Sequence, residues 1–453
     1  MDLTIHPVRR IKGRFPVPPD CELAQLAAVL SLLCPGRCTI DNWPQHKAAE
    51  ALFASLRGLG AKIAVEGTAV RIEGKSVSNL SSPETALDCA DAATAFVLFS
   101  GLLCGRPFPS AICGMGREVS AAGVSVGEAL GRMGGSVRYE GAPAARLNIV
   151  PATLRGVGTK TESVLPWAKM ATLMAGLFAE GKTSVTEELP LPDDLERVLP
   201  AYGIAAEITY PQRRASRREE LLQGIEVLSE TEKFHKAVTV KGPLESLRPV
   251  DWVLPGDCSL AAPLIAAAVM LPRSEVVIED VALNPTRTGF SKVLKRMGAE
   301  ITMSRRRMEN GVPVGDISVV GSTLKATKVP LAEIPSLIAE LPLLTIVAGR
   351  AAGVTVIRGV AELKNAGMLP VGLITENLRR LGVKVAELED GWAIEGPTEW
   401  HAAEIDCGGN AAMGMAFAVA GLLAEKQTTI QHAECVTSRF PDFQRLILTM
   451  SGR

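Results

Sequence analysis

The sequence predicts a two-domain protein of mixed α/β class that is assembled from repeated units. Its 453 residues exceed the usual size of a single hydrophobic core, so two domains are the default expectation. A nine-residue phrase recurs along the chain, and apolar helices rich in Ala and Gly fall between its copies. The two series interleave, which predicts about six units, each with one buried helix and one amphipathic helix.

The recurring phrase predicts an amphipathic helix, a cap and a strand. In each copy, apolar residues at helical spacing end at a glycine that can adopt the left-handed cap, and alternating residues then predict a strand. The period of roughly 70–95 residues is longer than that of the usual solenoid repeats, so compact α+β units are expected instead. The copies are residues 55–63, 129–137, 293–301 and 377–385, with a weaker one at 197–205.

Six apolar segments predict buried helices. Their small side chains allow close approach of neighbouring helices, so we expect them to pack behind the sheets. The segments are residues 23–33, 92–103, 168–178, 260–270, 338–347 and 411–423. The most polar stretch, residues 211–220, predicts a solvated loop or hairpin insertion, with a phosphate-binding patch as the alternative.

Composition excludes several classes of partner. The net charge of −1 gives no field that favours nucleic acid, and the longest apolar stretch, residues 260–271, is too short to span a bilayer. Nine scattered cysteines without CxxC spacing, and five isolated histidines, predict neither a zinc site nor a disulfide framework. Residues 1–10 carry no secretory signal. We therefore expect a cytoplasmic monomer without metal or cofactor, whose partner is a small-molecule substrate.

Five segments, in order along the chain, carry a family resemblance. They read GDCSLAAPL at 256–264, NPTRTG at 284–289, IPSLIAELP at 334–342, MAFAVAGL at 415–422 and RFPDF at 439–443. The chain resembles the EPSP synthase (enolpyruvyl transferase) family over nearly its whole length. The resemblance implies an inside-out α/β barrel of two domains, each with three βαβαββ units. It places one domain at residues 1–18 plus 253–453 and the other at 19–252, with Pro-containing crossings near 16–20 and 250–255.

The ligand-binding segments of the family are altered here. Members transfer a carboxyvinyl group from phosphoenolpyruvate to a phosphorylated substrate, which requires clustered cations and carboxylates for proton transfer. Cys21 replaces a phosphate-binding Lys, Glu22 places a negative charge beside it, and Leu26 and Val97 replace Arg. Further departures are Leu165-Pro166-Trp167 for Ser-Ser-Gln, Ala339 for the catalytic Asp, and Asn410-Ala411-Ala412 for Asp-His-Arg. Each lost cation forfeits about 1.5–3 kcal/mol, so we expect the anion site to be gone.

Polar residues at cleft positions of the family are the candidates for a new site. The catalytic candidates are Glu22, Lys169, Glu340 and Lys364. The substrate-binding candidates are Asp20, Gln25, Asp91, Thr94, Arg117, Trp167, Asn365, Asn410 and Arg439.

Structural alternatives exist for several candidates. Asp20 and Asp257 are also expected to cap helices. For Lys169, in an otherwise apolar helix, the alternatives are snorkelling to solvent, pairing with Glu22, or acting as a base of shifted pKa. Trp167 either stacks on a ring-shaped ligand or fills space.

Three functions follow from these residues. The first is an enzyme that acts on a different small, cyclic hydroxy-acid-like substrate by acid/base elimination, isomerisation or altered transfer. The second is a phosphoenolpyruvate-dependent 3-phosphoshikimate 1-carboxyvinyltransferase whose cations have relocated to Arg117, Lys169, Lys364 and Arg439. The third is a non-catalytic clamshell binding protein.

Overall fold

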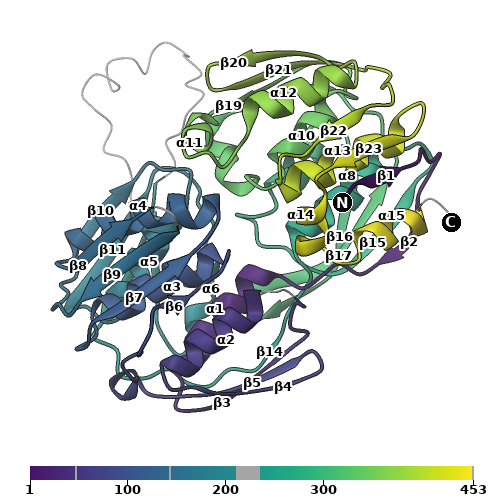
Figure 1. Ribbon diagram of the computed structural model, residues 1–453. Coiled ribbons are helices and arrows are strands. Elements are labelled where there is room, and N and C mark those ends of the chain that lie inside the picture. The colour runs from purple at the N-terminus through teal and green to yellow at the C-terminus, as the bar shows by residue number, and fades with distance from the viewer. Residues whose placement is uncertain (46–47, 142–143, 211–234, 451–453) are drawn as a thin grey trace.

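The computed structural model describes residues 1–45, 48–141, 144–210 and 235–450 as six open sheets with helices between them (Figure 1). The polar stretch 211–220 lies outside the described residues. Five sheets have four strands and one has three, and none of the described strands closes a sheet into a barrel. The expected barrel is therefore a set of separate sheets arranged around buried helices.

The first three sheets are built mainly from residues 36–253. They run in the orders β14-β3-β5-β4, β6-β7-β9-β8 and β10-β11-β13-β12. The strands are β3 (Gly36–Asp41), β4 (Lys62–Glu66), β5 (Ala69–Gly74), β6 (Leu87–Asp88), β7 (Ser110–Gly114), β8 (Ser136–Glu140), β9 (Ala145–Val150), β10 (Gly158–Thr161), β11 (Gly181–Glu187), β12 (Glu207–Thr209), β13 (Lys236–Gly242) and β14 (Trp252–Val253). The helices are α1 (Cys21–Leu32), α2 (Ala48–Gly58), α3 (Ala93–Cys104), α4 (Arg117–Arg132), α5 (Trp167–Gly176) and α6 (Asp194–Val198).

The other three sheets combine the two ends of the chain. Their orders are β16-β17-β15-β2, β18-β19-β21-β20 and β1-β23-β22. The strands are β1 (Leu3–Ile5), β2 (Lys12–Phe15), β15 (Glu275–Ala282), β16 (Glu300–Glu309), β17 (Val312–Val320), β18 (Lys328–Val329), β19 (Gly353–Arg358), β20 (Lys384–Leu388), β21 (Gly391–Gly396), β22 (Glu404–Asp406) and β23 (Thr428–Gln431). The helices are α8 (Cys258–Met270), α9 (Gly289–Arg296), α10 (Leu341–Ala348), α11 (Ala361–Asn365), α12 (Val371–Arg380), α13 (Ala411–Leu423), α14 (Glu434–Arg439) and α15 (Phe443–Met450).

Each four-stranded sheet repeats one pairing pattern, which confirms the repeated unit. In the sheet of β10 to β13, the first two strands are parallel and the other pairs are antiparallel. The sheet of β6 to β9 pairs in the same way. In both, the described elements follow one another in the order β-α-β-α-β-β. Because the first pair is parallel, it needs a crossover, and the buried helix supplies it.

Two of the units take their first strand from a distant part of the chain. Strand β2 pairs parallel with β15, and β14 pairs parallel with β3. Strand β1 also pairs with β23, so the N-terminal segment lies among the last elements in Figure 1. The domain boundaries proposed from the sequence stay a prediction, and β14 at residues 252–253 straddles the second of them.

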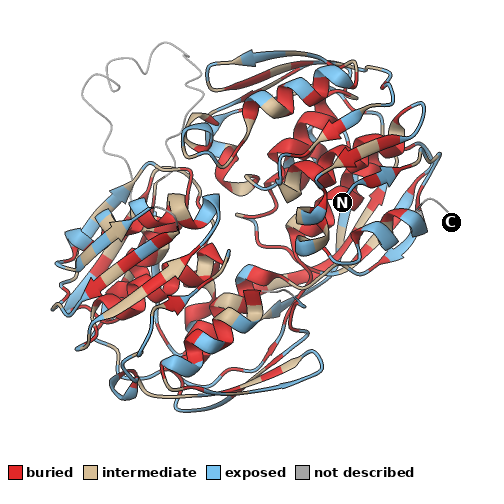
Figure 2. Cartoon of the chain, in the orientation of Figure 1, coloured by how far each residue is buried: buried red, intermediate tan, exposed pale blue. Residues whose placement is uncertain are grey.

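The six apolar segments form the predicted buried helices. Helix α3 packs against both α1 and α5, while α8, α10 and α13 all pack on one another, and Figure 2 shows both groups as mostly buried. Small side chains permit this close packing: a Cβ on Gly101 of α3 would lie 2.7 Å from the carbonyl oxygen of Ala171 on α5. Among the described residues, no helix is long and apolar enough to cross a membrane.

The predicted glycine caps are confirmed. A glycine follows each amphipathic helix with a positive φ between 87° and 103°, a conformation that other residues rarely adopt. The capping glycines are Gly60, Gly134, Gly203, Gly298 and Gly382.

Lys169 belongs to a buried ion network rather than to an open surface. Its Nζ lies 2.8 Å from Glu187, 2.6 Å from Glu196, and 2.9 Å from the carbonyl oxygen of Pro192. Lys236 lies within 3.6 Å of the same two carboxylates. Burial lowers the pKa of Lys169, but the attraction of Glu196 and Glu187 outweighs burial and raises that pKa above its ordinary value. Neither snorkelling nor pairing with Glu22 describes this side chain, and the raised pKa disfavours a neutral base.

Replacing Lys169 should destabilise the fold strongly. The substitution Lys169→Met leaves Glu187 and Glu196 with Lys236 alone, and a buried ion pair that loses one partner costs about 3–5 kcal/mol. Urea unfolding should show that loss. Lys182→Met, on the exposed face of β11, is the matched control and should change stability by less than about 0.5 kcal/mol. A similar small change for Lys169→Met would refute the structural role.

Candidate functional site

The two chain crossings lie against each other. The N–H of Asp20 donates to the carbonyl of Pro255, and the N–H of Asp257 donates to that of Pro18, both at 2.9 Å. Each aspartate also caps a helix: Asp20 Oδ1 accepts from two N–H groups of α1, and Asp257 Oδ1 accepts from the Ser259 N–H of α8. The predicted capping role is confirmed for both, and it leaves one oxygen of each carboxylate for other contacts.

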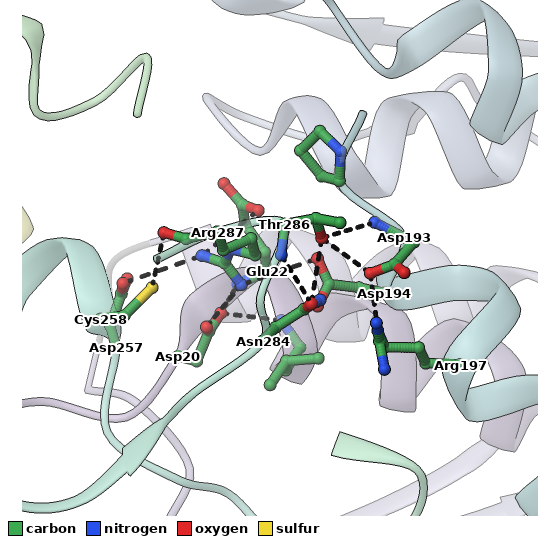
Figure 3. A network of polar contacts seen from close by, with 12 residues as sticks. Asp20, Glu22, Asp193, Asp194, Arg197, Asp257, Cys258, Asn284, Thr286 and Arg287 are labelled. Atoms are coloured by element: carbon green, nitrogen blue, oxygen red, sulfur yellow. Dashed lines mark hydrogen bonds and ion pairs between the residues drawn. The ribbon is translucent and has the colours of Figure 1, made fainter. Parts of the chain in front are cut away.

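Arg287 fills the position between these carboxylates (Figure 3). Its guanidinium lies 2.6 Å from Asp20, 3.6 Å from Glu22, 3.8 Å from Asp257 and 3.9 Å from Asp194. Arg287 is only 9% exposed. Burial lowers its pKa, but Asp20 and Glu22 outweigh burial and hold it well above its ordinary value. Arg287 is therefore a permanent cation shared among four carboxylates.

The loop that carries Arg287 also joins the two halves of the molecule. Asn284 Nδ2 donates to Asp194 at 2.8 Å, and Thr286 Oγ1 donates to Asp193 at 2.7 Å. Asp193 and Asp194 lie at the start of α6, and the close-up in Figure 3 shows them facing this loop. Neither aspartate was among the candidate residues predicted from the sequence. Their signal was a consecutive acidic pair at the start of a helix, which is also an ordinary helix-capping pattern.

The carboxylates at this junction outnumber the cations. Burial raises the pKa of Asp257 to about 6, with Asp20 adding to the effect and Arg439 and Arg287 opposing it. Burial also raises the pKa of Asp194 to about 6, against the attraction of Arg287. Such shifts follow when buried charges of one sign are in excess. An added anion would meet the same excess.

Arg439, the second cation near the junction, is also held by a carboxylate. Its Nη2 donates to Asp257 Oδ2 at 3.3 Å from the end of α14. Glu118, exposed in the first turn of α4, also attracts Arg439. It directly follows the candidate Arg117 but was not among the residues predicted from the sequence. Glu22 and Glu118 thus place further negative charge near Arg439.

Glu340 is a buried carboxyl group near the junction. It lies at the N-terminus of α10 and is 4% exposed. Burial raises its pKa to about 7; Asp257 adds to the shift, whereas the hydrogen bond with Ser259 and the charge of Arg287 oppose it. A carboxyl group with a pKa near 7 exchanges a proton readily at neutral pH. Cys21, by contrast, has a pKa raised to about 12, chiefly by burial, so its thiol stays protonated.

Other candidates have structural partners away from Arg287. Gln25 Oε1 accepts from the Ala95 N–H at 2.9 Å and ties α1 to α3, while Asn410 Oδ1 caps α13. Trp167 is buried in the hydrophobic core. Thr94 is half-buried within α3.

The remaining candidates are exposed. Arg117 donates to the carbonyl of Gly367 at 3.4 Å, and Lys364 pairs with Glu387 at 2.9 Å. Asp91 and Asn365 are also exposed. The structure therefore brings together Asp20, Glu22, Glu340 and Arg439, while Lys169 and Lys364 have separate ion partners. The described residues contain no cluster of three or more His, Cys, Asp or Glu arranged to hold a metal ion.

Known proteins resemble the chain over its full length. The sequence profile of EPSP synthase (3-phosphoshikimate 1-carboxyvinyltransferase) matches residues 5–447. A 3-phosphoshikimate 1-carboxyvinyltransferase of Desulforamulus reducens is 34% identical over 455 residues, which cover 99% of each chain. One from Citrifermentans bemidjiense is 31% identical over 98% of each chain.

Solved structures show the same fold. The EPSP synthase of Acinetobacter baumannii superposes with a TM-score of 0.81 at 28% identity, covering 99% of this chain and 98% of that one. The enolpyruvyl transferase NikO of Streptomyces tendae superposes with a TM-score of 0.72 at 15% identity, covering 99% and 97% of the two chains. The full-length profile match, together with relatives above 30% identity, shows that this chain belongs to the EPSP synthase family of carboxyvinyltransferases.

Proposed function

We propose that this family member is an enzyme with a substrate other than the phosphoenolpyruvate and shikimate 3-phosphate pair. The substrate we expect is small, cyclic and hydroxy-acid-like, and the chemistry is acid/base elimination, isomerisation or altered transfer. The observation that carries the proposal is Arg287, which is already shared among Asp20, Glu22, Asp194 and Asp257. A cation so neutralised has little attraction left for a polyanionic ligand. We further propose that the protein is a cytoplasmic monomer.

Glu340 supports the acid/base part of the proposal. Its pKa of about 7 lets the carboxyl group act in either protonation state near neutral pH. Ser259, in the first turn of α8, lies near the Glu340 carboxyl group and lowers its pKa, which limits the rise caused by burial. The neighbouring positive charges belong to Arg287, which is buried, and Arg439, which is held by Asp257.

A phosphoenolpyruvate-dependent 3-phosphoshikimate 1-carboxyvinyltransferase is the second candidate. The full-length similarity to enzymes of that name favours it. It would require relocated cations at Arg117, Lys169, Lys364 and Arg439. Lys169, Lys364 and Arg439 each pair with a carboxylate, and Arg117 contacts a backbone carbonyl. These contacts support the first candidate over the second.

Ligand-induced thermal shifts separate the two candidates. We expect millimolar phosphoenolpyruvate and shikimate 3-phosphate, alone and together, to leave the melting temperature unchanged. A ligand that binds the folded state raises stability by RT ln(1 + [L]/Kd), so real binding at that concentration produces a shift of several degrees. The EPSP synthase of Acinetobacter baumannii is the positive control. A comparable shift for this chain would establish the second candidate instead. If no small hydroxy acid shifts the melting temperature either, the non-catalytic clamshell becomes the better description.

The raised pKa of Glu340 predicts a pH-dependent stability. A folded-state pKa of about 7, above the ordinary 4.5, means that the folded protein binds this proton more tightly than the unfolded chain. The resulting stabilisation is complete below pH 4.5 and disappears as the pH rises through 7. Glu340→Gln keeps a neutral group at this position, so its free energy of unfolding should fall less than that of the wild type between pH 5 and 8. The full shift corresponds to about 3 kcal/mol.

The comparison of the two proteins isolates Glu340, because Asp194 and Asp257 titrate in both. Glu300→Gln is a suitable control since Glu300 is exposed at the start of β16. Its stability curve should run parallel to that of the wild type. Parallel curves for Glu340→Gln and the wild type would remove Glu340 as the proton carrier.

A further inference from the structure

Two cysteines outside the candidate site lie close together at one edge of the β1-β23-β22 sheet. Strands β22 and β23 are parallel neighbours, with Asp406 opposite Gln431. Cys407 directly follows β22, and Cys435 lies four residues after the end of β23, in the first turn of α14. Because parallel strands end at the same edge of a sheet, the topology itself brings the two residues together.

The thiols face each other. The two Sγ atoms are 3.7 Å apart, and both thiols also reach the carbonyl oxygen of His432, Cys407 at 3.2 Å and Cys435 at 3.6 Å. His432 has a φ of 56°, a left-handed conformation that reverses the chain between β23 and α14. A disulfide requires an S–S distance of about 2.05 Å, so the sulfurs need to approach by less than 2 Å.

The two cysteines differ in reactivity and access. Cys407 is fully buried, whereas Cys435 is half-buried. The hydrogen bond from Cys435 lowers the pKa of Cys407 to about 7 despite the opposing effect of burial, and the Gly409 N–H contributes in the same direction. A thiolate is the nucleophile in thiol chemistry. The pair therefore combines an accessible sulfur with a buried nucleophile beside it.

We propose that Cys407 and Cys435 are a redox pair, a modification site at which hydrogen peroxide joins the two sulfurs in a disulfide. The proton between the two sulfurs moves to Cys407, and the accessible Cys435 thiolate takes an oxygen as the peroxide O–O bond breaks, which gives a sulfenic acid. The hydroxide released takes that proton from Cys407 and becomes the first water. The Cys407 thiolate then attacks that sulfur, forms the S–S bond and displaces hydroxide, which takes up a proton as a second water. Two thiols are oxidised and one peroxide is reduced. A dithiol reductant reverses the reaction.

The crosslink would act on an element of the candidate site. Arg439 lies four residues after Cys435 on α14, one helical turn away, and contacts Asp257. Asn410, which caps α13, lies three residues after Cys407. The disulfide ties the first turn of α14 to the segment that leads into α13, and so restricts the motion of Arg439.

Peptide mapping tests the pair directly. Trypsin cleaves at Lys426, between the cysteines, and places them in the separate peptides 385–426 and 427–439. After brief treatment of the intact protein with hydrogen peroxide, these peptides should be joined, with a mass lower by two hydrogen atoms than their sum. Dithiothreitol should separate them. Sulfinic or sulfonic acid at Cys435 without a crosslink would overturn the proposal.

Two variants and an internal control sharpen the test. Cys407→Ser should leave a sulfenic acid on Cys435 that dimedone traps, and Cys435→Ser, at the less buried position, should abolish oxidation of Cys407. Cys34 and Cys38 are a second pair of neighbouring thiols, but both are fully buried and should stay reduced. Crosslinking of Cys34 to Cys38 at the same rate would show that the proximity of two thiols alone determines disulfide formation.

Hydrogen exchange tests the proposed effect on α14. In the oxidised protein, the amides of residues 434–439 should exchange more slowly than in the reduced protein, and peroxide should not change their exchange in Cys435→Ser. Unchanged exchange in the crosslinked wild type would show that the disulfide does not restrict Arg439.

Discussion

The Arg287 cluster is the interaction on which the assembly depends. Both chain crossings end in an aspartate that begins a buried helix, and both aspartates face the same guanidinium. Asp194 on α6 brings the third element to this point. Removing the arginine would leave several buried carboxylates uncompensated, which is among the most destabilising changes available to a protein. The junction between the halves therefore requires a cation at this position.

This requirement limits what the Arg287 cluster can bind. An arginine that neutralises structural carboxylates cannot at the same time offer its full charge to a phosphate or carboxylate ligand. The charge of Arg439 is shared in the same way, because Arg439 contacts Asp257. Glu22 and Glu118 add negative charge beside these two arginines. This local charge balance is the physical basis of the proposed acid/base role for Glu340.

The sequence was sufficient for those features that depend on local pattern. Gly60 and Gly298 cap their helices because glycine alone adopts that φ at little cost, and the apolar helices are buried because their small side chains permit it. The sequence was not sufficient to predict contacts between residues that are distant along the chain and meet only in the tertiary fold. Lys169 was an anomaly in the sequence, but Glu187 and Glu196 follow 18 and 27 residues later, on another strand and helix. Asp194 was missed for the same reason.

The segments that match the family are the ones that hold the molecule together. Asn284, Thr286 and Arg287 from NPTRTG all bond to the other half of the protein, and Asp257 from GDCS receives Arg287 and Arg439. The segment with Cys21 and Glu22, which departs from the family pattern, lies beside these contacts. The fold can persist under such changes because the contacts that join the two halves come from the segments that match the family. Resemblance in the segments that form these contacts therefore supports the fold, whereas substrate identity depends on the segments that depart from the family.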